Sequence, residues 1–549
     1  MTELRLLPAG PDGTLIELAD LDEALRLFRA LRDARLPGVT ELVPAARTVL
    51  VRHRPAARDR VHDAARAAAL DPALVDAPGA TDAAVRVPVR YDGADLAEVA
   101  TLLGITPEDV IARHTGQDWQ VAFTGFAPGF AYLVAPGAGL RVPRRSTPRT
   151  RIPAGAVALA GEFSGVYPRA SPGGWQLIGV TETPMWDLAR EVPALLLPGG
   201  RVRFVVEEPA GALIQPAPQP NQAKPQEDPE AALRVLAVGP QALVQDLGRP
   251  GHADLGVSPA GALDAGALRA ANRLVGNPVD AAGIEAAYGG LVIRAEADAV
   301  IALTGATVPA ERIDAAHVAR PVPMHTAVAV GAGERLRLGA PHSGVRTVLA
   351  VRGGIDVPPV LGSRSADTLA ALGPAPLAPG DLLPIGRVAG LGLAVAAPEL
   401  ASEATPYGGS LPGASDFVTL RVHLGPRDDW FSPEALDRLL GQPWRVTPQS
   451  DRVGLRLNGA EALTRSPEFQ DAELPSEGTV HGALQVPAEG QPVLFLADHP
   501  LTGGYPVIAV LDPADRDVAA QIPVGASIRF RLVSRDSPIS EVPTEGPTP

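Results

Sequence analysis

The chain has 549 residues, 46% hydrophobic and 20% charged, with a net charge of −14 and no cysteine. This length exceeds what a single core supports, so we expect several domains of ordinary globular composition. The acidic balance argues against nucleic acid as a partner, and the absence of cysteine excludes disulfides, thiolate nucleophiles and cysteine-bound metals. No metal site is predicted. No apolar run has membrane-spanning length and no signal peptide is recognisable, so we expect a cytoplasmic protein.

Lys224 is the single lysine of the sequence, and every other basic residue is arginine or histidine. A phosphate-binding loop with the pattern Gly-x-x-x-x-Gly-Lys-Ser/Thr is therefore impossible. A Schiff-base lysine and a biotinylated carrier turn are not expected either. Anions must be bound by arginine, by backbone amides or by helix N-termini.

Residues 1–84 predict a small α+β domain. Between Asp20 and Arg32 the apolar residues fall on one helical face, and Asp20 is suited to cap the helix. Residues 85–208 predict short strands, together with a helix over Pro107–Thr115 that Thr106 opens.

The second half of the chain is set off by composition. Residues 209–231 repeat proline among polar residues and predict a semi-stiff linker. After it we expect two further domains, over residues 232–410 and 411–535, and a disordered tail over 536–549.

One stretch occurs twice. Trp119 and Trp444 are each followed two positions later by valine and ten positions later by glycine. A Gly-Gly-aromatic signal then recurs at residues 173–175 and 503–505, and both copies close on a similar glycine-to-phenylalanine pattern. Agreement in order and spacing predicts one supersecondary unit used twice.

The first copy contains two features suited to binding. Gly125 to Leu133 places two glycines and a proline among aromatic residues, which predicts a tight loop against a hydrophobic wall. Residues 143–153 carry Arg144, Arg145, Arg149 and Arg151. These arginines form either a solvated basic loop or a clamp for a carboxylate or phosphate.

The motifs of the first half resemble the B subunit of bacterial 5-oxoprolinase, also called KipI or allophanate hydrolase subunit 1. They are Gly125 to Leu133, Pro143-Arg144, Pro148-Arg149, Pro153 to Gly155, Gly161 and Pro172 to Gly179. The resemblance covers nearly all of residues 1–208. Ala131 departs from it, because the family usually has proline there.

The second half resembles the C subunit of 5-oxoprolinase, also called KipA or allophanate hydrolase subunit 2, from about residue 233 to 533. The motifs are Gln245 to Gly290, Arg352 to Asp356, Leu361 to Ser365, Ser450 to Leu457, Ser476 to Gly478, Gly482 to Val486 and Thr502 to Pro506. Pro500-Leu501-Thr502 departs from the usual Gln-Thr-Thr, so a polar contact of the family is expected to be missing.

The resemblance implies a mainly β fold with α+β parts. Its cyclophilin-like β-barrels would be duplicated, with a small N-terminal α+β domain and a third, barrel-like unit over residues 232–410. Two equivalent barrels are then expected to face each other across a cleft.

The predicted site lies in loops of both barrels. We single out as catalytic Asp498, Asp451, His499 and Glu477. We expect substrate to be bound by Arg452, Gln485, Tyr505, Gly503, Gly504, Arg144, Arg149, Gly125, Phe126 and Gly129.

Two of these assignments have open alternatives. Asp498 and His499 form either a general base oriented by a carboxylate or a surface contact. Arg452 holds either a substrate carboxylate or a structural ion pair. His481 and His499 follow no family pattern and take no role from the resemblance.

The resemblance implies a fusion of the B and C subunits of 5-oxoprolinase. Its reaction would be the ATP-dependent opening of 5-oxo-L-proline to L-glutamate, together with a separate A subunit. A carboxyltransferase of a biotin-dependent urea or amide carboxylase is the first alternative. A regulator of a histidine kinase, like KipI and KipA, is the second. A homo-oligomer is compatible with each of these functions.

Overall fold

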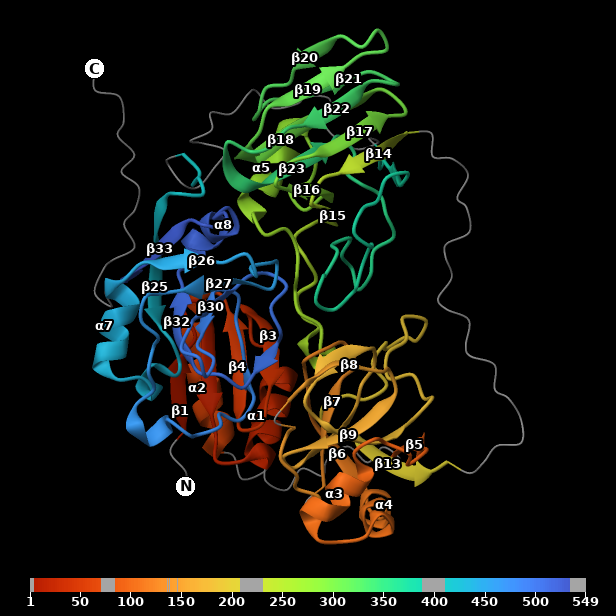
Figure 1. Ribbon diagram of the computed structural model, residues 1–549, viewed down its shortest axis with the longest axis vertical. Coiled ribbons are helices and arrows are strands. Elements are labelled where there is room, and N and C mark those ends of the chain that lie inside the picture. The colour runs from red at the N-terminus through yellow and green to blue at the C-terminus, as the bar shows by residue number, and fades with distance from the viewer. Residues whose placement is uncertain are drawn as a thin grey trace.

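The computed structural model describes residues 4–70, 84–135, 137, 139–145, 147–207, 231–387 and 410–533. They form an N-terminal unit, a first barrel, a central unit and a second barrel, coloured mainly red, orange, green and blue in Figure 1. The predicted linker before residue 231 and the predicted tail lie outside the described residues. Within these residues, no helix is both long and apolar enough to cross a membrane.

The N-terminal unit is a four-stranded sheet with two helices. Its order is β1 (Arg5–Pro8), β2 (Gly13–Glu17), β4 (Thr48–His53) and β3 (Val39–Pro44), with helices α1 (Leu21–Ala34) and α2 (Arg58–Leu70). Asp20 caps α1 by accepting a hydrogen bond from the backbone N–H of Glu23 at 2.9 Å. The predicted helix and its cap are therefore confirmed.

The first barrel is a seven-stranded sheet whose edges approach each other through a bridge between Arg90 and Val180. Helices α3 (Leu96–Leu103) and α4 (Pro107–Thr115) precede most of its strands, and Thr106 forms a capping box with Asp109 at the start of α4. The strand order is β12 (Gln176–Val180), β9 (Ala156–Ala160), β10 (Phe163–Val166), β7 (Ala131–Val134), β6 (Trp119–Thr124), β13 (Arg201–Val206) and β5 (Val85–Val89), with β8 (Arg149–Ile152) and β11 (Ser171–Gly173) paired beside it.

The second barrel repeats this order and is closed. It runs β32 (Val507–Leu511), β29 (Ala483–Gln485), β30 (Val493–Phe495), β27 (Gly454–Asn458), β26 (Trp444–Val446), β33 (Ser527–Leu532) and β25 (Phe417–Leu424), and β25 pairs with β32. Helices α7 (Pro433–Gly441) and α8 (Arg516–Ala520) and the pair β28 (Glu477–Gly478) and β31 (Thr502–Gly503) complete it.

The two tryptophans that mark the repeat have the same role. Each indole Nε1 donates a 2.9 Å hydrogen bond to the carbonyl five residues earlier, from Trp119 to His114 and from Trp444 to Leu439. Both indoles are buried in the cores of their barrels. The shared strand order and this shared contact confirm the predicted duplication.

The central unit packs two sheets around one core. One sheet runs β20 (Ala319–Pro321), β19 (Ala310–Ile313), β22 (Arg335–Leu338), β17 (Leu291–Ala295), β14 (Ala232–Val238) and β24 (Leu382–Pro384). The other runs β15 (Gln241–Gln245), β16 (Gly283–Ala287), β23 (Ser343–Val351), β18 (Ala299–Thr307) and β21 (Val328–Val330), and helix α5 (Ala265–Val275) packs on it.

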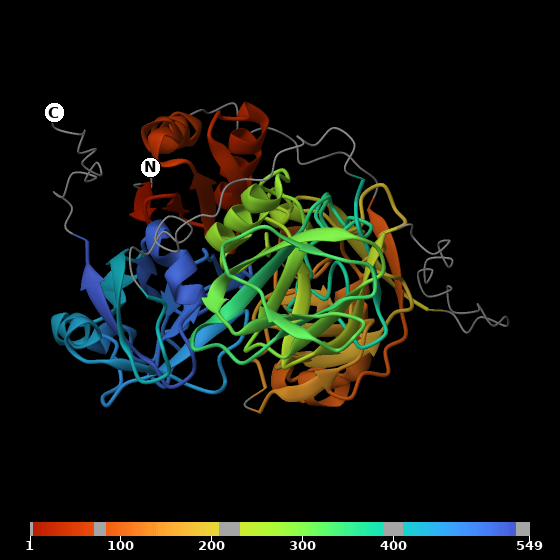
Figure 2. The same cartoon turned by 90° about the horizontal axis from the view of Figure 1, so that it is seen from above.

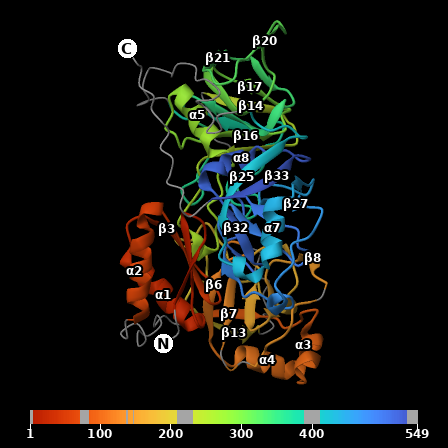
Figure 3. The ribbon, with the colours of Figure 1, turned by 90° about the vertical axis from the view of Figure 1, so that its left-hand side faces the viewer.

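The N-terminal unit packs against the second barrel, although it is joined in sequence to the first. Leu15 and Leu50 of its sheet share an apolar cluster with Val480, Phe495 and other residues of the second barrel. Figure 3 shows this unit beside the second barrel, and Figure 2 shows the central unit in front of the first barrel when the molecule is viewed from above. Residues from both halves of the sequence therefore meet in one structure.

Candidate active site

The two barrels touch through a glycine and a threonine. A Cβ atom on Gly125 would lie 2.3 Å from the Oγ1 atom of Thr502, so a side chain at this position would have to displace Thr502. Thr502 Oγ1 is buried and has no hydrogen-bond partner among the described residues. The predicted loop of the first copy thus lies against the predicted loop of the second.

A segment of the central unit is inserted beside this contact. Thr124 donates from Oγ1 to the carbonyl oxygens of Ala253 and Asp254, each at 3.0 Å, and the N–H of Gly129 donates to Leu255 O at 3.0 Å. Figure 1 shows this segment descending between the two barrels. The Gly125–Gly129 loop is therefore positioned by parts of the chain more than a hundred residues away.

Aromatic side chains line one face of the first barrel next to this loop. Tyr132 packs edge-on against Phe130 and Trp175 at ring-centroid distances of 5.1 and 5.5 Å. Phe126, whose φ is +66°, packs edge-on against Phe130 and Tyr167 at 5.3 and 6.1 Å. We call this cluster the aromatic floor; its members are Phe123, Phe126, Phe130, Tyr132, Phe163, Tyr167 and Trp175.

Two phenols and one arginine supply polar groups to the aromatic floor. Burial raises the pKa of Tyr132 to about 12, against which the charge of Arg144 acts in the opposite direction. Burial also raises the pKa of Tyr167, and the Tyr132 phenol adds to this effect. Both phenols are therefore protonated donors at neutral pH. Arg144 is exposed, and its guanidinium has no hydrogen bond or ion pair within the described part of the chain.

Two of the other three arginines of the loop, Arg145 and Arg149, are occupied by a carboxylate of the protein, whereas Arg151 is exposed. Arg149 binds Asp95 through two hydrogen bonds of 2.9 and 2.7 Å, and Arg145 donates to the same carboxylate at 2.9 Å. Although burial alone would raise the pKa of Asp95, these arginines and the N–H of Leu177 lower it. Of the predicted clamp residues Arg144 and Arg149, Arg144 is the one that is exposed and not bonded to a carboxylate of the described residues.

Arg452 lies in a buried ion-pair network. Its Nε donates to Asp498 at 3.0 Å, and its other nitrogens donate to Asp498, Glu285 and the Gly261 carbonyl. Asp498 also accepts from the backbone N–H and hydroxyl of Thr368, at 3.0 and 2.7 Å. These contacts match the structural ion pair that was the alternative for Arg452, and they join the second barrel to the central unit.

The remaining predicted catalytic residues lie apart from the aromatic floor. His499 and Asp498 are buried at 1% and 0% exposure, which excludes a surface contact for that pair. His499 Nδ1 contacts the Pro500 carbonyl at 2.9 Å, and burial lowers the pKa of its ring to about 4. Glu477 binds Arg427, which also reaches Glu17 of the N-terminal unit at 3.0 Å.

The other five predicted residues of the second barrel shape turns, pack against each other or are exposed. Asp451 is exposed and accepts from the N–H groups of Val453 and Gly454, at 2.8 and 3.2 Å. Gln485 donates to the Tyr505 carbonyl at 3.1 Å, and a Cβ on Gly503 would lie 2.5 Å from its Nε2. Gly504 and Tyr505 are exposed, with 47% of Tyr505 accessible.

The sequence departure at Pro500-Leu501 has a structural counterpart. Leu501 is buried in the apolar cluster that joins the second barrel to the N-terminal unit. An apolar side chain therefore suits this position. At Leu501, where the sequence predicts that a polar contact of the family is missing, the side chain contributes to packing.

Two family models match most of the chain. The carboxyltransferase domain, subdomains A and B, matches residues 255–532. The chain belongs to the carboxyltransferase-domain family. The carboxyltransferase domain, subdomains C and D, matches residues 4–196.

Individual relatives match the two halves of the chain separately. This carboxyltransferase-family chain is 39% identical to the C subunit of 5-oxoprolinase from Escherichia coli K12 over 302 residues, which cover 54% of the chain and 90% of that protein. It is 38% identical to the B subunit of 5-oxoprolinase from Escherichia coli O157:H7 over 203 residues, covering 35% and 88%. The predicted resemblance to both subunits, in one fused chain, is confirmed.

A urea amidolyase and a solved structure are also similar to this chain. Urea amidolyase of Lachancea kluyveri is 33% identical over 322 residues, which cover 55% of this chain and 17% of that protein. The crystal structure of TTHA0988 superimposes with a TM-score of 0.78 at 35% identity, covering 95% of this chain and all of that one. The mainly β, barrel-containing fold of this carboxyltransferase-family chain is thereby confirmed.

Sequence reasoning did not assign roles to Tyr132, Tyr167 and Trp175. Tyr132 and Trp175 lie inside the quoted motifs, but nothing local says that both rings meet on one barrel face. A period-two pattern of aromatics across several strands is the signal that points to such a face. Among the described residues, no three histidine or acidic side chains gather in a way that could hold a metal ion.

Proposed function

We propose that this chain supplies the B and C parts of a 5-oxoprolinase, which opens 5-oxo-L-proline to L-glutamate with ATP and a separate A subunit. The observation that carries the proposal is the contact of Gly125 with Thr502, at the junction of the halves that match the B and C subunits. Fusing the two subunits preserves a junction that separate chains would have to form by association.

The aromatic floor offers chemistry that suits this substrate. The carboxylate of 5-oxoproline would bind the exposed guanidinium of Arg144, since arginine pairs with carboxylates in bidentate fashion. A protonated phenol of Tyr132 would donate to the lactam oxygen, where negative charge develops when the amide opens. The aromatic rings would keep bulk water away and so strengthen both interactions.

The same residues do not fit the triphosphate of ATP. Arg145 and Arg149 are already bonded to Asp95, whereas Arg144 is exposed and its charge acts on both Tyr132 and Tyr167. One guanidinium suits one carboxylate better than three phosphates. ATP would therefore bind at another surface or on the separate A subunit.

Reconstitution tests the proposal. The full chain is mixed with a candidate A subunit, 5-oxo-L-proline and ATP, and L-glutamate is measured by an enzyme-coupled assay. Glutamate should form only when both proteins and ATP are present. Its absence with every such partner that binds the chain would refute the proposal.

The match to urea amidolyase supports a second candidate, a carboxyltransferase that receives carboxylated biotin from a separate carrier. Loss of the carboxyl group from a carboxylated biotin carrier, dependent on this chain and on urea or another amide, would favour it. Inhibition of a histidine kinase by the chain, without either reaction, would instead favour a regulator like KipI and KipA.

A further inference from the structure

A cavity lies away from the aromatic floor, between the N-terminal unit and the inserted segment of the central unit. Its volume is about 320 Å³, near the lower end of small-molecule sites, and its walls come from the end of α1, from β3 and from residues 251–254. Phe28, Leu31, Val39 and Leu42 form an apolar wall. None of the assigned chemistry uses this space.

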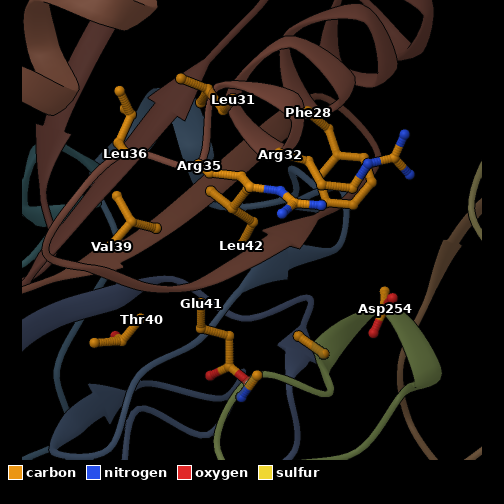
Figure 4. A pocket seen from close by; sticks show the side chains of 12 residues that line it. Phe28, Leu31, Arg32, Arg35, Leu36, Val39, Thr40, Glu41, Leu42 and Asp254 are labelled. Atoms are coloured by element: carbon orange, nitrogen blue, oxygen red, sulfur yellow. The ribbon is translucent and has the colours of Figure 1, made fainter.

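The positively and negatively charged side chains of the cavity lie on different sides of it. Figure 4 shows the guanidinium groups of Arg32 and Arg35 on one side and the carboxylates of Glu41 and Asp254 on the other. The side chain of Glu41 is only 2% exposed; it accepts from the Gly251 N–H at 3.2 Å and from Arg52 at 3.4 Å. Burial raises the pKa of both carboxyl groups, so a cationic ligand group would stabilise their ionised forms.

Arg35 holds an unusual backbone conformation at this place. It ends α1 in the left-handed region, with φ +43° and ψ +52°, where helices ordinarily place glycine. Its guanidinium has no hydrogen bond or ion pair in the described residues. A non-glycine residue in this region costs free energy relative to glycine, and such residues cluster at functional sites.

We propose that this cavity binds a free amino acid with an apolar side chain. Its carboxylate would lie against Arg35 and Arg32, its ammonium against Glu41 and Asp254, and its side chain against the apolar wall. A divalent cation fits less well because two arginines face the carboxylates. A phosphate fits less well because the carboxylates would repel it.

A ligand bound in the cavity would affect the candidate active site through one segment that contacts both. Gly251, Ala253 and Asp254 line the cavity, and the carbonyls of Ala253 and Asp254 accept from Thr124 beside the Gly125–Gly129 loop. A bound amino acid would therefore restrain the backbone that supports this loop. The binding proposal itself does not depend on the reaction proposed above.

Calorimetry with L-leucine as the probe tests the assignment on the full chain. Isocaproate lacks the ammonium group and isoamylamine lacks the carboxylate, so each should bind at least about tenfold more weakly than L-leucine. Arg35→Gly and Glu41→Gln should each weaken L-leucine binding about tenfold or more, while Arg66→Gln, on the exposed side of α2, should leave it unchanged. Arg35→Gly should not lower the melting temperature, because glycine suits the left-handed position.

The outcomes against the proposal are equally definite. No heat and no saturation-transfer NMR signal with L-leucine at about 10 mM would overturn it. So would equal binding of isocaproate, or wild-type binding by both cavity variants. Measurable binding without slower amide exchange over residues 251–257 would place the ligand elsewhere and would also overturn it.

Discussion

Replacing Arg452 by methionine separates a structural arginine from one that binds substrate. Methionine keeps much of the side-chain length but removes the charge and every donor. Arg452 is 1% exposed and bonds to Asp498, Glu285 and the Gly261 carbonyl. The substitution therefore leaves two buried carboxylates without their shared cation, at the interface of the second barrel and the central unit.

The expected cost follows from what each carboxylate retains. Removing one partner of a buried ion pair destabilises a protein by about 3–5 kcal/mol. Asp498 keeps two bonds from Thr368, and Glu285 keeps the N–H of Leu263 at 2.8 Å and lies 3.7 Å from Arg346. These remaining contacts place the loss near the lower end of that range, at about 3 kcal/mol.

Urea unfolding followed by tryptophan fluorescence measures this loss, because Trp444 is fully buried in the second barrel. Arg445→Met is the matched control, since Arg445 is the exposed neighbour of Trp444 and should change stability by less than about 0.5 kcal/mol. Adding Asp498→Asn and Glu285→Gln to Arg452→Met should recover part of the loss, since the unpaired charges are then gone.

Two results would contradict the reasoning. The first is a loss for Arg452→Met smaller than about 1 kcal/mol, which is the range of an exposed ion pair. The second is an unchanged unfolding curve together with weaker substrate binding, which would return Arg452 to the substrate-binding role predicted from the sequence.

Other perturbations test the junction, the buried carboxyl group of Asp264 and the aromatic floor. Gly125→Ala should destabilise the contact of the barrels by about 1–3 kcal/mol, and Thr502→Ala should relieve part of this loss; additive effects in thermal unfolding would contradict a direct clash. Burial, aided by the carboxylate of Asp517, raises the pKa of Asp264, which caps helix α5, from 3.8 to about 7, so the folded state binds the proton more tightly. Stability should therefore fall as pH rises between these values, and Asp264→Asn should flatten the slope in unfolding measured across that range. Arg144→Gln should lower kcat/KM for the proposed opening of 5-oxo-L-proline about tenfold to a hundredfold without changing the melting temperature. Arg151→Gln, in the same loop and also exposed, should change neither kcat/KM nor the melting temperature.

Local structure was readable from the sequence because its determinants are close together along the chain. The helix over Pro107–Thr115 and the caps at Asp20 and Thr106 depend on contacts within three or four residues. The repeat was also readable, because each Trp–Gly signal occurs within one strand and turn. Amino-acid order alone therefore determined the helices, the duplication and the exclusion of thiol and P-loop chemistry.

Tertiary structure decided which of the charged residues are free. Arg452 and Arg149 find their carboxylates 46 and 54 positions away, and Arg452 also reaches Glu285 across 167 positions. Nothing local distinguishes these arginines from Arg144, which is exposed. The N-terminal unit likewise packs on the barrel that is distant in sequence, because burial of its apolar sheet depends on surface shape and not on chain connectivity.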